Sequence, residues 1–171
     1  MTRTKKKDTR KFKLELVENE KFDGSTKYFL HETFIEFNRF FNDQLIFKYP
    51  NKTSQKINLP SIEQPNGGRQ SRIEDYNFDG YDDISFSVSD AGMGVYQYYS
   101  VFLYNPKTKK FDALAEPDFK NSNCSCLCDI QVNPKKKILS TSCRGGASWW
   151  KDEYQYENGK LKWLKSYQEN Q

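Results

Sequence analysis

Between residues 154 and 163 the chain reads YQYENGKLKW, and this stretch predicts the kind of fold. Asn158-Gly159 is a strong signal for a two-residue turn, because both residues tolerate the positive φ that a tight hairpin requires. Such a turn places Tyr156 opposite Leu161. Two residues further from the turn it places Tyr154 opposite Trp163, with this aromatic pair on one face. The stretch therefore predicts two antiparallel strands joined by a tight turn.

Similar turn signals recur along the chain at intervals of 25 to 28 residues. They are Asp23-Gly24, Asn51-Lys52, the segment from Asn77 to Gly80, Asn105-Pro106, Asn133-Pro134 and Asn158-Gly159. Between them lie runs rich in aromatic and β-branched residues, which favour strands. These runs are 12–17, 33–37, 45–49, 84–88, 98–104, 138–142, 151–156 and 161–167.

No long segment has a 3.6-residue period, although residues 32–43 admit one or two helical turns. A unit of about 27 residues holds two or three short strands, fewer than the blade of a full propeller. The sequence therefore predicts an all-β fold, an array of short β-hairpins in a small, propeller-like architecture.

The composition predicts a folded chain whose core is aromatic rather than aliphatic. Only 36% of the 171 residues are hydrophobic, yet they include 13 Phe, 11 Tyr and 3 Trp. Disordered chains are poor in these residues. We expect a flexible basic tail over residues 1–10 and a single hairpin domain over residues 11–171, since the length is typical of one domain.

The net charge of +4 comes from the N-terminus. Residues 1–13 carry seven basic residues and one acidic residue, whereas the rest of the chain carries 20 basic and 22 acidic residues. A surface that binds a phosphate backbone needs its positive charge on the folded body. We therefore expect no nucleic-acid partner.

The sequence offers few residues for catalysis, and we expect a protein that is not an enzyme. His31 is the sole histidine, which excludes a histidine zinc cluster and leaves a catalytic triad dependent on one residue. Phosphate-loop, dinucleotide-binding and nucleophile-elbow motifs are absent. Asp152 and Glu153 leave carboxylate chemistry open, but no spacing singles out an acid and a base. We also expect no membrane span, because no stretch approaches the roughly 18 apolar residues that one requires.

The segment from Asp75 to Asp83 reads DYNFDGYDD and has oxygen ligands at the spacing of a calcium loop. Side chains at alternating positions of a tight loop point inward, where a hard cation takes oxygen ligands. Gly80 permits the sharp turn that follows. We expect Ca²⁺ to be held by Asp75, Asn77, Asp79, the Tyr81 backbone carbonyl and Asp83.

This loop differs from an EF-hand, which has Glu at position 12 where this chain has Phe86. It resembles instead the nine-residue loop of integrin-type FG-GAP and VCBS repeats, where calcium pins a hairpin turn. The alternative is a plain solvated turn. Since neighbouring carboxylates repel one another and a cation offsets that repulsion, we expect calcium to stabilise the folded chain rather than to take part in a reaction.

Four cysteines fall within 20 residues of one another: Cys124, Cys126, Cys128 and Cys143. They indicate either disulfides in an exported protein or thiols around a metal, and the C-x-C-x-C spacing fits no common zinc site. A two-residue turn at Pro134-Lys135 would pair Val132 with Lys137 and, further along, Cys126 with Cys143. A one-residue bulge would shift this register to another partner. Disulfides predict a periplasmic or cell-surface protein whose export signal is missing from the sequence as given.

The order of four motifs resembles a known bacterial family. They are the calcium-like loop, the turn from Leu103 to Thr108, the Arg144-Gly145-Gly146 segment and the hairpin from Tyr156 to Leu161. The resemblance covers residues 72–164 and is to small, calcium-binding, propeller-like exported proteins. Among them are immunity proteins that protect the periplasm against lysozyme-like peptidoglycan hydrolases delivered by a type IV secretion system in bacterial competition. The cysteine cluster departs from this pattern, as does Trp149-Trp150 where tyrosines are expected.

The resemblance implies a lysozyme inhibitor that inserts an aromatic loop into the hydrolase cleft. The segment from Arg144 to Trp150 is the best candidate for that loop, because two glycines allow close approach and a guanidinium pairs with carboxylates. The expected partner-binding residues are Arg144, Gly145, Gly146, Ser148, Trp149, Trp150 and Tyr154. Adjacent tryptophans on a strand point to opposite faces, so we expect one in the core and one exposed. The alternative to an inhibitor is a non-enzymatic, calcium-binding cell-surface or carbohydrate-binding module.

Overall fold

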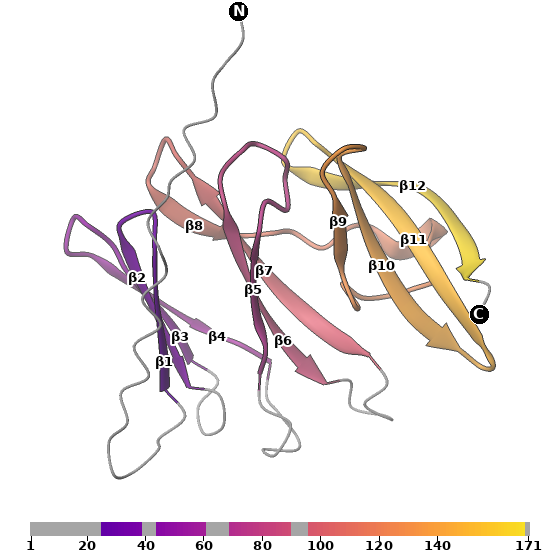
Figure 1. The fold of residues 1–171 in the computed structure, drawn as a ribbon, viewed down its shortest axis with the longest axis horizontal. Helices are drawn as coiled ribbons and strands as arrows, with labels where there is room; N and C mark the ends of the chain where they lie inside the picture. Colours follow the sequence, from indigo (N-terminus) through magenta and orange to yellow (C-terminus); the bar gives the residue numbers. More distant parts are fainter. Residues whose placement is uncertain (1–24, 39–43, 61–68, 90–95, 170–171) are drawn as a thin grey trace, which may run out of the picture. The chain divides into compact units, whose positions relative to one another are not determined.

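The computed structural model describes residues 25–38, 44–60, 69–89 and 96–169. These ranges form twelve strands in three four-stranded antiparallel sheets, with one 3-10 helix, η2 (Phe119–Asn121), and no α-helix (Figure 1). The all-β prediction is confirmed. The chain divides into two compact units, Met1–Leu59 and Pro60–Gln171, where the sequence predicts one domain. The basic tail, the Asp23-Gly24 turn and the predicted strand 12–17 lie outside the described residues.

The first unit contains one sheet in which each strand pairs with the next along the chain. Its strands are β1 (Ser25–Leu30), β2 (Thr33–Asn38), β3 (Gln44–Lys48) and β4 (Ser54–Asn58). In β2 the side chains of Thr33, Ile35 and Phe37 are buried while Phe34 is exposed, which is the alternation of a strand. The helical alternative for residues 32–43 is therefore wrong over the described part of that segment.

The second unit contains two sheets of the same kind, in which each strand pairs with the next along the chain. The first consists of β5 (Ser71–Glu74), β6 (Asp83–Ser89), β7 (Gln97–Asn105) and β8 (Lys110–Ala113). The second consists of β9 (Gln131–Asn133), β10 (Ile138–Gly145), β11 (Ser148–Glu157) and β12 (Lys160–Glu169). One apolar core joins them, with Val101 and Leu103 of β7 packed together with Leu139 of β10 and Tyr154 of β11. The two sheets of this unit therefore share a core.

The turn signals within the described residues all join neighbouring strands of one sheet. Asn51-Lys52 connects β3 to β4, and each later signal connects the next pair, up to Asn158-Gly159 between β11 and β12. The interval of 25 to 28 residues therefore corresponds to two strands, and each four-stranded sheet contains two such intervals. The predicted array of hairpins is present, grouped into four-stranded sheets.

The register of the last hairpin is confirmed, because Tyr156 pairs with Leu161 and Tyr154 with Trp163. The register predicted at Pro134-Lys135 is wrong, since Val132 pairs with Leu139 rather than with Lys137. Four residues form this turn. The Asn133 side chain accepts a hydrogen bond from the Lys136 N–H (3.1 Å), and Lys137 takes a positive φ of 54°, which adds two residues to the connection.

The cysteine pairing also differs from the predicted one. Disulfides join Cys124 to Cys143 and Cys126 to Cys128, so the predicted pair of Cys126 and Cys143 is wrong. The four cysteines form a small buried cluster against which Tyr96, Tyr98 and Trp150 pack. No helix in the described part of the chain is long and apolar enough to cross a membrane.

Candidate functional site

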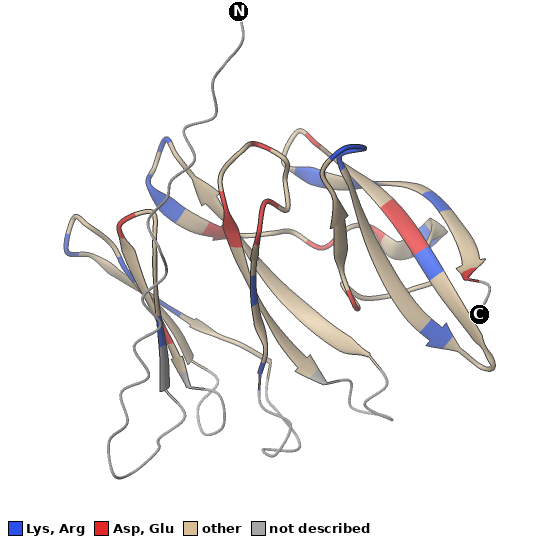
Figure 2. Cartoon of the chain, viewed as in Figure 1, with Lys and Arg blue, Asp and Glu red and all other residues tan. Residues whose placement is uncertain are grey.

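The loop between β5 and β6 carries the predicted calcium ligands, and acidic residues mark it in Figure 2. The Asp79 N–H donates to Oδ1 of Asp75 and to Oδ1 of Asn77, each at 3.1 Å. The Gly80 N–H donates to the other Asp75 oxygen (2.8 Å), and the Tyr81 N–H donates to Oδ1 of Asp79 (2.9 Å). Gly80 has a φ of 93°, which favours glycine. The side-chain oxygens of Asp75 and Asn77 therefore converge within the loop.

Asp83 lies beneath the loop and is fully buried. Its two oxygens accept hydrogen bonds from the N–H groups of Tyr76 (2.9 Å) and Tyr104 (2.8 Å), so it ties both ends of the loop to β7. Burial raises the pKa of this carboxyl to about 7, and the charges of Asp79 and Asp75 add to the effect. Burial also raises the pKa of Asp75. The site thus concentrates negative charge with no cationic side chain bonded to these carboxylates in the described residues.

The side-chain oxygens of this loop are ligands of the type that a calcium ion binds. Each carboxylate oxygen keeps a second lone pair when it accepts one N–H, so Asp75, Asp79 and Asp83 retain acceptor capacity for a cation. Across the described residues, no group of three or more His, Cys, Asp or Glu side chains is already arranged as a metal site. Calcium binding at this loop therefore stays a prediction.

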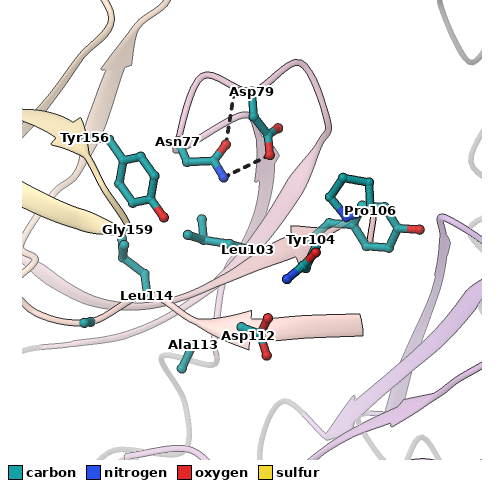
Figure 3. Close-up of a pocket in the computed structure, with 12 residues that line it drawn as sticks. Asn77, Asp79, Leu103, Tyr104, Pro106, Asp112, Ala113, Leu114, Tyr156 and Gly159 are labelled. Atoms are coloured by element: carbon teal, nitrogen blue, oxygen red, sulfur yellow. Dashed lines mark hydrogen bonds between the residues drawn. The ribbon is translucent and has the colours of Figure 1, made fainter. Parts of the chain in front are cut away.

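A pocket of about 330 Å³ lies beside the loop (Figure 3). Asn77 and Asp79 line one side of it, and Leu103, Tyr104 and Tyr156 line the others. Burial and the charges of Asp83 and Asp79 raise the pKa of the Tyr156 hydroxyl. Asp79, which lines this pocket, is exposed, so the loop is accessible to solvent.

The predicted partner-binding segment forms the tip of the β10–β11 hairpin. Gly145 pairs with Ser148 across a two-residue turn of Gly146 and Ala147, and Gly146 has a φ of 63°. All residues from Arg144 to Ala147 are exposed. The Arg144 Nε–H donates to the Gly146 carbonyl (3.1 Å), which holds the guanidinium at the tip. The structure thus brings Arg144, both glycines and Ser148 together on an exposed turn.

Trp149 and Trp150 point to opposite faces of β11, as expected for adjacent strand residues. Trp150 packs on the cysteine cluster, while Trp149 lines a cleft with Arg72 and Tyr99. Both indoles are half-buried, so the expectation of one core and one exposed tryptophan is wrong. The disulfide to Cys143, whose strand partner is Trp150, anchors the hairpin two residues from the turn.

Tyr154 does not belong to this surface, because its side chain is fully buried in the shared core. Its place in the predicted partner-binding set is corrected accordingly.

Asp152 and Glu153 point to opposite faces of β11 and do not converge. Asp152 is buried and accepts the N–H groups of Asn123 (2.9 Å) and Cys124 (2.7 Å) as well as the Ser166 hydroxyl. Glu153 accepts the Tyr167 hydroxyl (3.0 Å). Sequence reasoning missed the structural role of Asp152, for which no local motif exists.

No family model matches the chain, and no curated protein matches it. A Xanthomonas type IV secretion system related protein of known structure is similar to this chain at 14% sequence identity and a TM-score of 0.47. The similarity covers 88% of this chain and 72% of that one.

Proposed function

We propose that this protein is a calcium-stabilised inhibitor of the immunity type, without catalytic activity of its own. It blocks the active-site cleft of a lysozyme-like peptidoglycan hydrolase by inserting the tip of the β10–β11 hairpin. Because disulfides persist in oxidising compartments, the two disulfides support a site of action in the periplasm or at the cell surface.

The observation that carries this proposal is an exposed hairpin tip that a disulfide anchors. A loop that is already ordered loses little conformational entropy on binding. Here the Cys124–Cys143 disulfide anchors the hairpin, and Asp152 holds the Cys124 backbone in turn. The exposed Arg144 offers a guanidinium to a carboxylate of the hydrolase. Trp149 and Trp150 offer partly exposed aromatic faces to a cleft that stacks on sugar rings.

Calcium has a supporting role in this proposal. It is held by Asp75, Asn77, Asp79, the Tyr81 carbonyl and Asp83, where its charge offsets the repulsion between carboxylates. The loop and the hairpin tip lie on different sheets of one unit that share a core. Calcium therefore stabilises the body that presents the hairpin and makes no contact with the hydrolase.

The proposal is tested by measuring cell-wall lysis by a panel of lysozyme-like hydrolases, with and without the protein. We expect the protein to suppress at least one hydrolase. Trp149→Ala and Arg144→Ala should weaken that suppression by about tenfold or more, as expected for residues at the centre of an interface. Lys136→Ala, on the exposed β9–β10 turn, is the matched control and should inhibit like the wild type. Unimpeded lysis by every hydrolase of the panel would contradict the proposal.

A further inference from the structure

We propose that a cleft in the second unit binds a neutral saccharide, an activity that does not depend on hydrolase inhibition. The cleft has a volume of about 390 Å³ and lies where β9 begins at the edge of its sheet, next to β5 and β7. Its walls come from both sheets of the unit, with Arg72 and Tyr99 on one side and Trp149 and Glu169 on the other. Binding pockets for small molecules begin at about this size.

The first wall of the cleft is fixed by Arg72. Its guanidinium donates to the Ile130 carbonyl (2.8 Å) and to Oε1 of Glu74 (2.7 Å), and lies over the Tyr99 ring at 5.5 Å from the centroid. Three partners from three parts of the chain thus hold one side chain. A group held in this way binds a ligand without first losing rotamer freedom.

The second wall is fixed by Lys151, which lies beside the cleft. Its ammonium donates to Oε1 of Gln131 (3.1 Å) and to Oε1 of Glu169 (3.4 Å). Both of these acceptors line the cleft. The amide of Gln131 and the second carboxylate oxygen of Glu169 are therefore positioned for a ligand.

Ser142 places a hydroxyl in the cleft. The residue is only 8% exposed and lines the cleft, and its hydroxyl has no side-chain hydrogen bond to a described residue. The hydroxyl is therefore free to donate to, or accept from, a ligand that enters the cleft. Asp129, beside it in the cleft, uses Oδ1 for the Gln97 N–H (2.9 Å) and has Oδ2 left as an acceptor. A donor and an acceptor thus face the same space.

Charge and shape select the ligand class. Arg72 is paired with Glu74, and Lys151 with Glu169, so neither cation is left to neutralise an anionic ligand. The remaining groups are a hydroxyl, an amide and carboxylate oxygens, beside the half-buried indole of Trp149. A sugar has an apolar face of C–H groups that packs on an aromatic ring, and a rim of hydroxyls that both donate and accept hydrogen bonds. A neutral saccharide matches both features.

The test is binding of cellobiose and N,N′-diacetylchitobiose to the full chain, followed by calorimetry and by the indole N–H signals in NMR spectra. At millimolar concentration, at least one of these sugars should bind and shift the Trp149 signal. Ser142→Ala should weaken binding about fivefold and Trp149→Ala about tenfold, as for the loss of a buried hydrogen bond and of an aromatic contact. Trp150→Ala changes the opposite face of the same strand and should leave affinity within about twofold. Melting curves of each variant establish that it is folded.

Two results would overturn the inference: neither sugar binds, or Trp150→Ala weakens binding as much as Trp149→Ala. The outcome is separate from that of the lysis assay, because Ser142 lies outside the hairpin tip. If the sugar binds and no hydrolase is inhibited, the cleft stands and the inhibitor proposal fails. If a hydrolase is inhibited and no sugar binds, the reverse holds.

Discussion

The loop between β5 and β6 and the segment between β8 and β9 are each held to a sheet by a buried aspartate. Asp83 accepts the Tyr76 N–H of the loop and the Tyr104 N–H of β7, whereas Asp152 accepts two backbone N–H groups of the second region together with the Ser166 hydroxyl. The two regions differ in the other interactions that act on them. Disulfides cross-link the second, whereas carboxylates that repel one another crowd the first. We therefore expect cations to stabilise the first region but not the second.

The largest effect is expected from Asp152→Ala. This change leaves two buried N–H groups and a hydroxyl without their acceptor, and should lower the free energy of unfolding by about 4 kcal/mol. Asp83→Ala should cost about 2 kcal/mol, because it frees two donors and also removes a carboxyl whose burial opposes its charge. Urea denaturation followed by tryptophan fluorescence measures both, since the three tryptophans lie in the second unit. Equal losses would remove the distinction between the two aspartates.

The next effect concerns the disulfides. Replacing Cys124 and Cys143 by serine opens a loop with a sequence separation of 19, and should lower the free energy of unfolding by about 3 kcal/mol. Cys126 and Cys128 close a much shorter loop, so their replacement is the matched control and should cost about 1.5 kcal/mol. A smaller loss for the long loop than for the short one in the same urea titration would show that the cross-link does not order this region.

A smaller effect is expected from calcium. It should raise the free energy of unfolding by about 2 kcal/mol when free calcium exceeds its dissociation constant about thirtyfold. Asp79→Asn should lose most of this response, because it removes one charge from the loop, while Asp112→Asn, at an exposed position of β8, should keep it. Thermal melts in calcium and in chelator provide the measurement. Identical midpoints for the wild type under both conditions would exclude a calcium site.

The smallest effect concerns the backbone of the first region. Gly80 has a φ of 93° and no atom within 4 Å of an added Cβ, so Gly80→Ala introduces backbone strain without a clash and should cost about 1 kcal/mol. Gly145→Ala, where φ is not positive and the nearest atoms are 3.5 Å away, serves as the control with a smaller expected cost. If Gly80→Ala is neutral in chelator, the loop does not depend on this conformation.

The sequence was sufficient to predict several strands that are rich in aromatic or β-branched residues, such as β7 and β11. The strands β4 (Ser54–Asn58) and β5 (Ser71–Glu74) were missed because they are short and mostly polar, and only pairing with a neighbour makes them strands. The strand β1 (Ser25–Leu30) was missed although it contains Tyr28 and Phe29. The register at Asn158-Gly159 followed from the turn type alone. At Asn133-Pro134 it did not, because the Asn side chain and a positive φ at Lys137 lengthen the turn.

The parts of the candidate site that are contiguous in sequence could be predicted. The loop from Asp75 to Asp83 and the exposed turn at Gly146 are contiguous in sequence, and their residues lie together in the structure. The cleft at Trp149 combines Arg72, Asp129 and Ser142, which are distant in the chain. The burial of Tyr154 likewise depends on packing between two sheets. Such groupings require the register and the packing, which a local motif does not contain.

In the proposed function the hairpin tip blocks the hydrolase while the calcium loop only stabilises the body. Hydrolase inhibition curves for the wild type, Arg144→Ala and Asp79→Asn separate these two roles, at a temperature where melts show all three to be folded. Arg144→Ala should weaken inhibition by about tenfold with an unchanged melting temperature, while Asp79→Asn should inhibit like the wild type. Wild-type inhibition by Arg144→Ala, or its loss in folded Asp79→Asn, would contradict this division of roles.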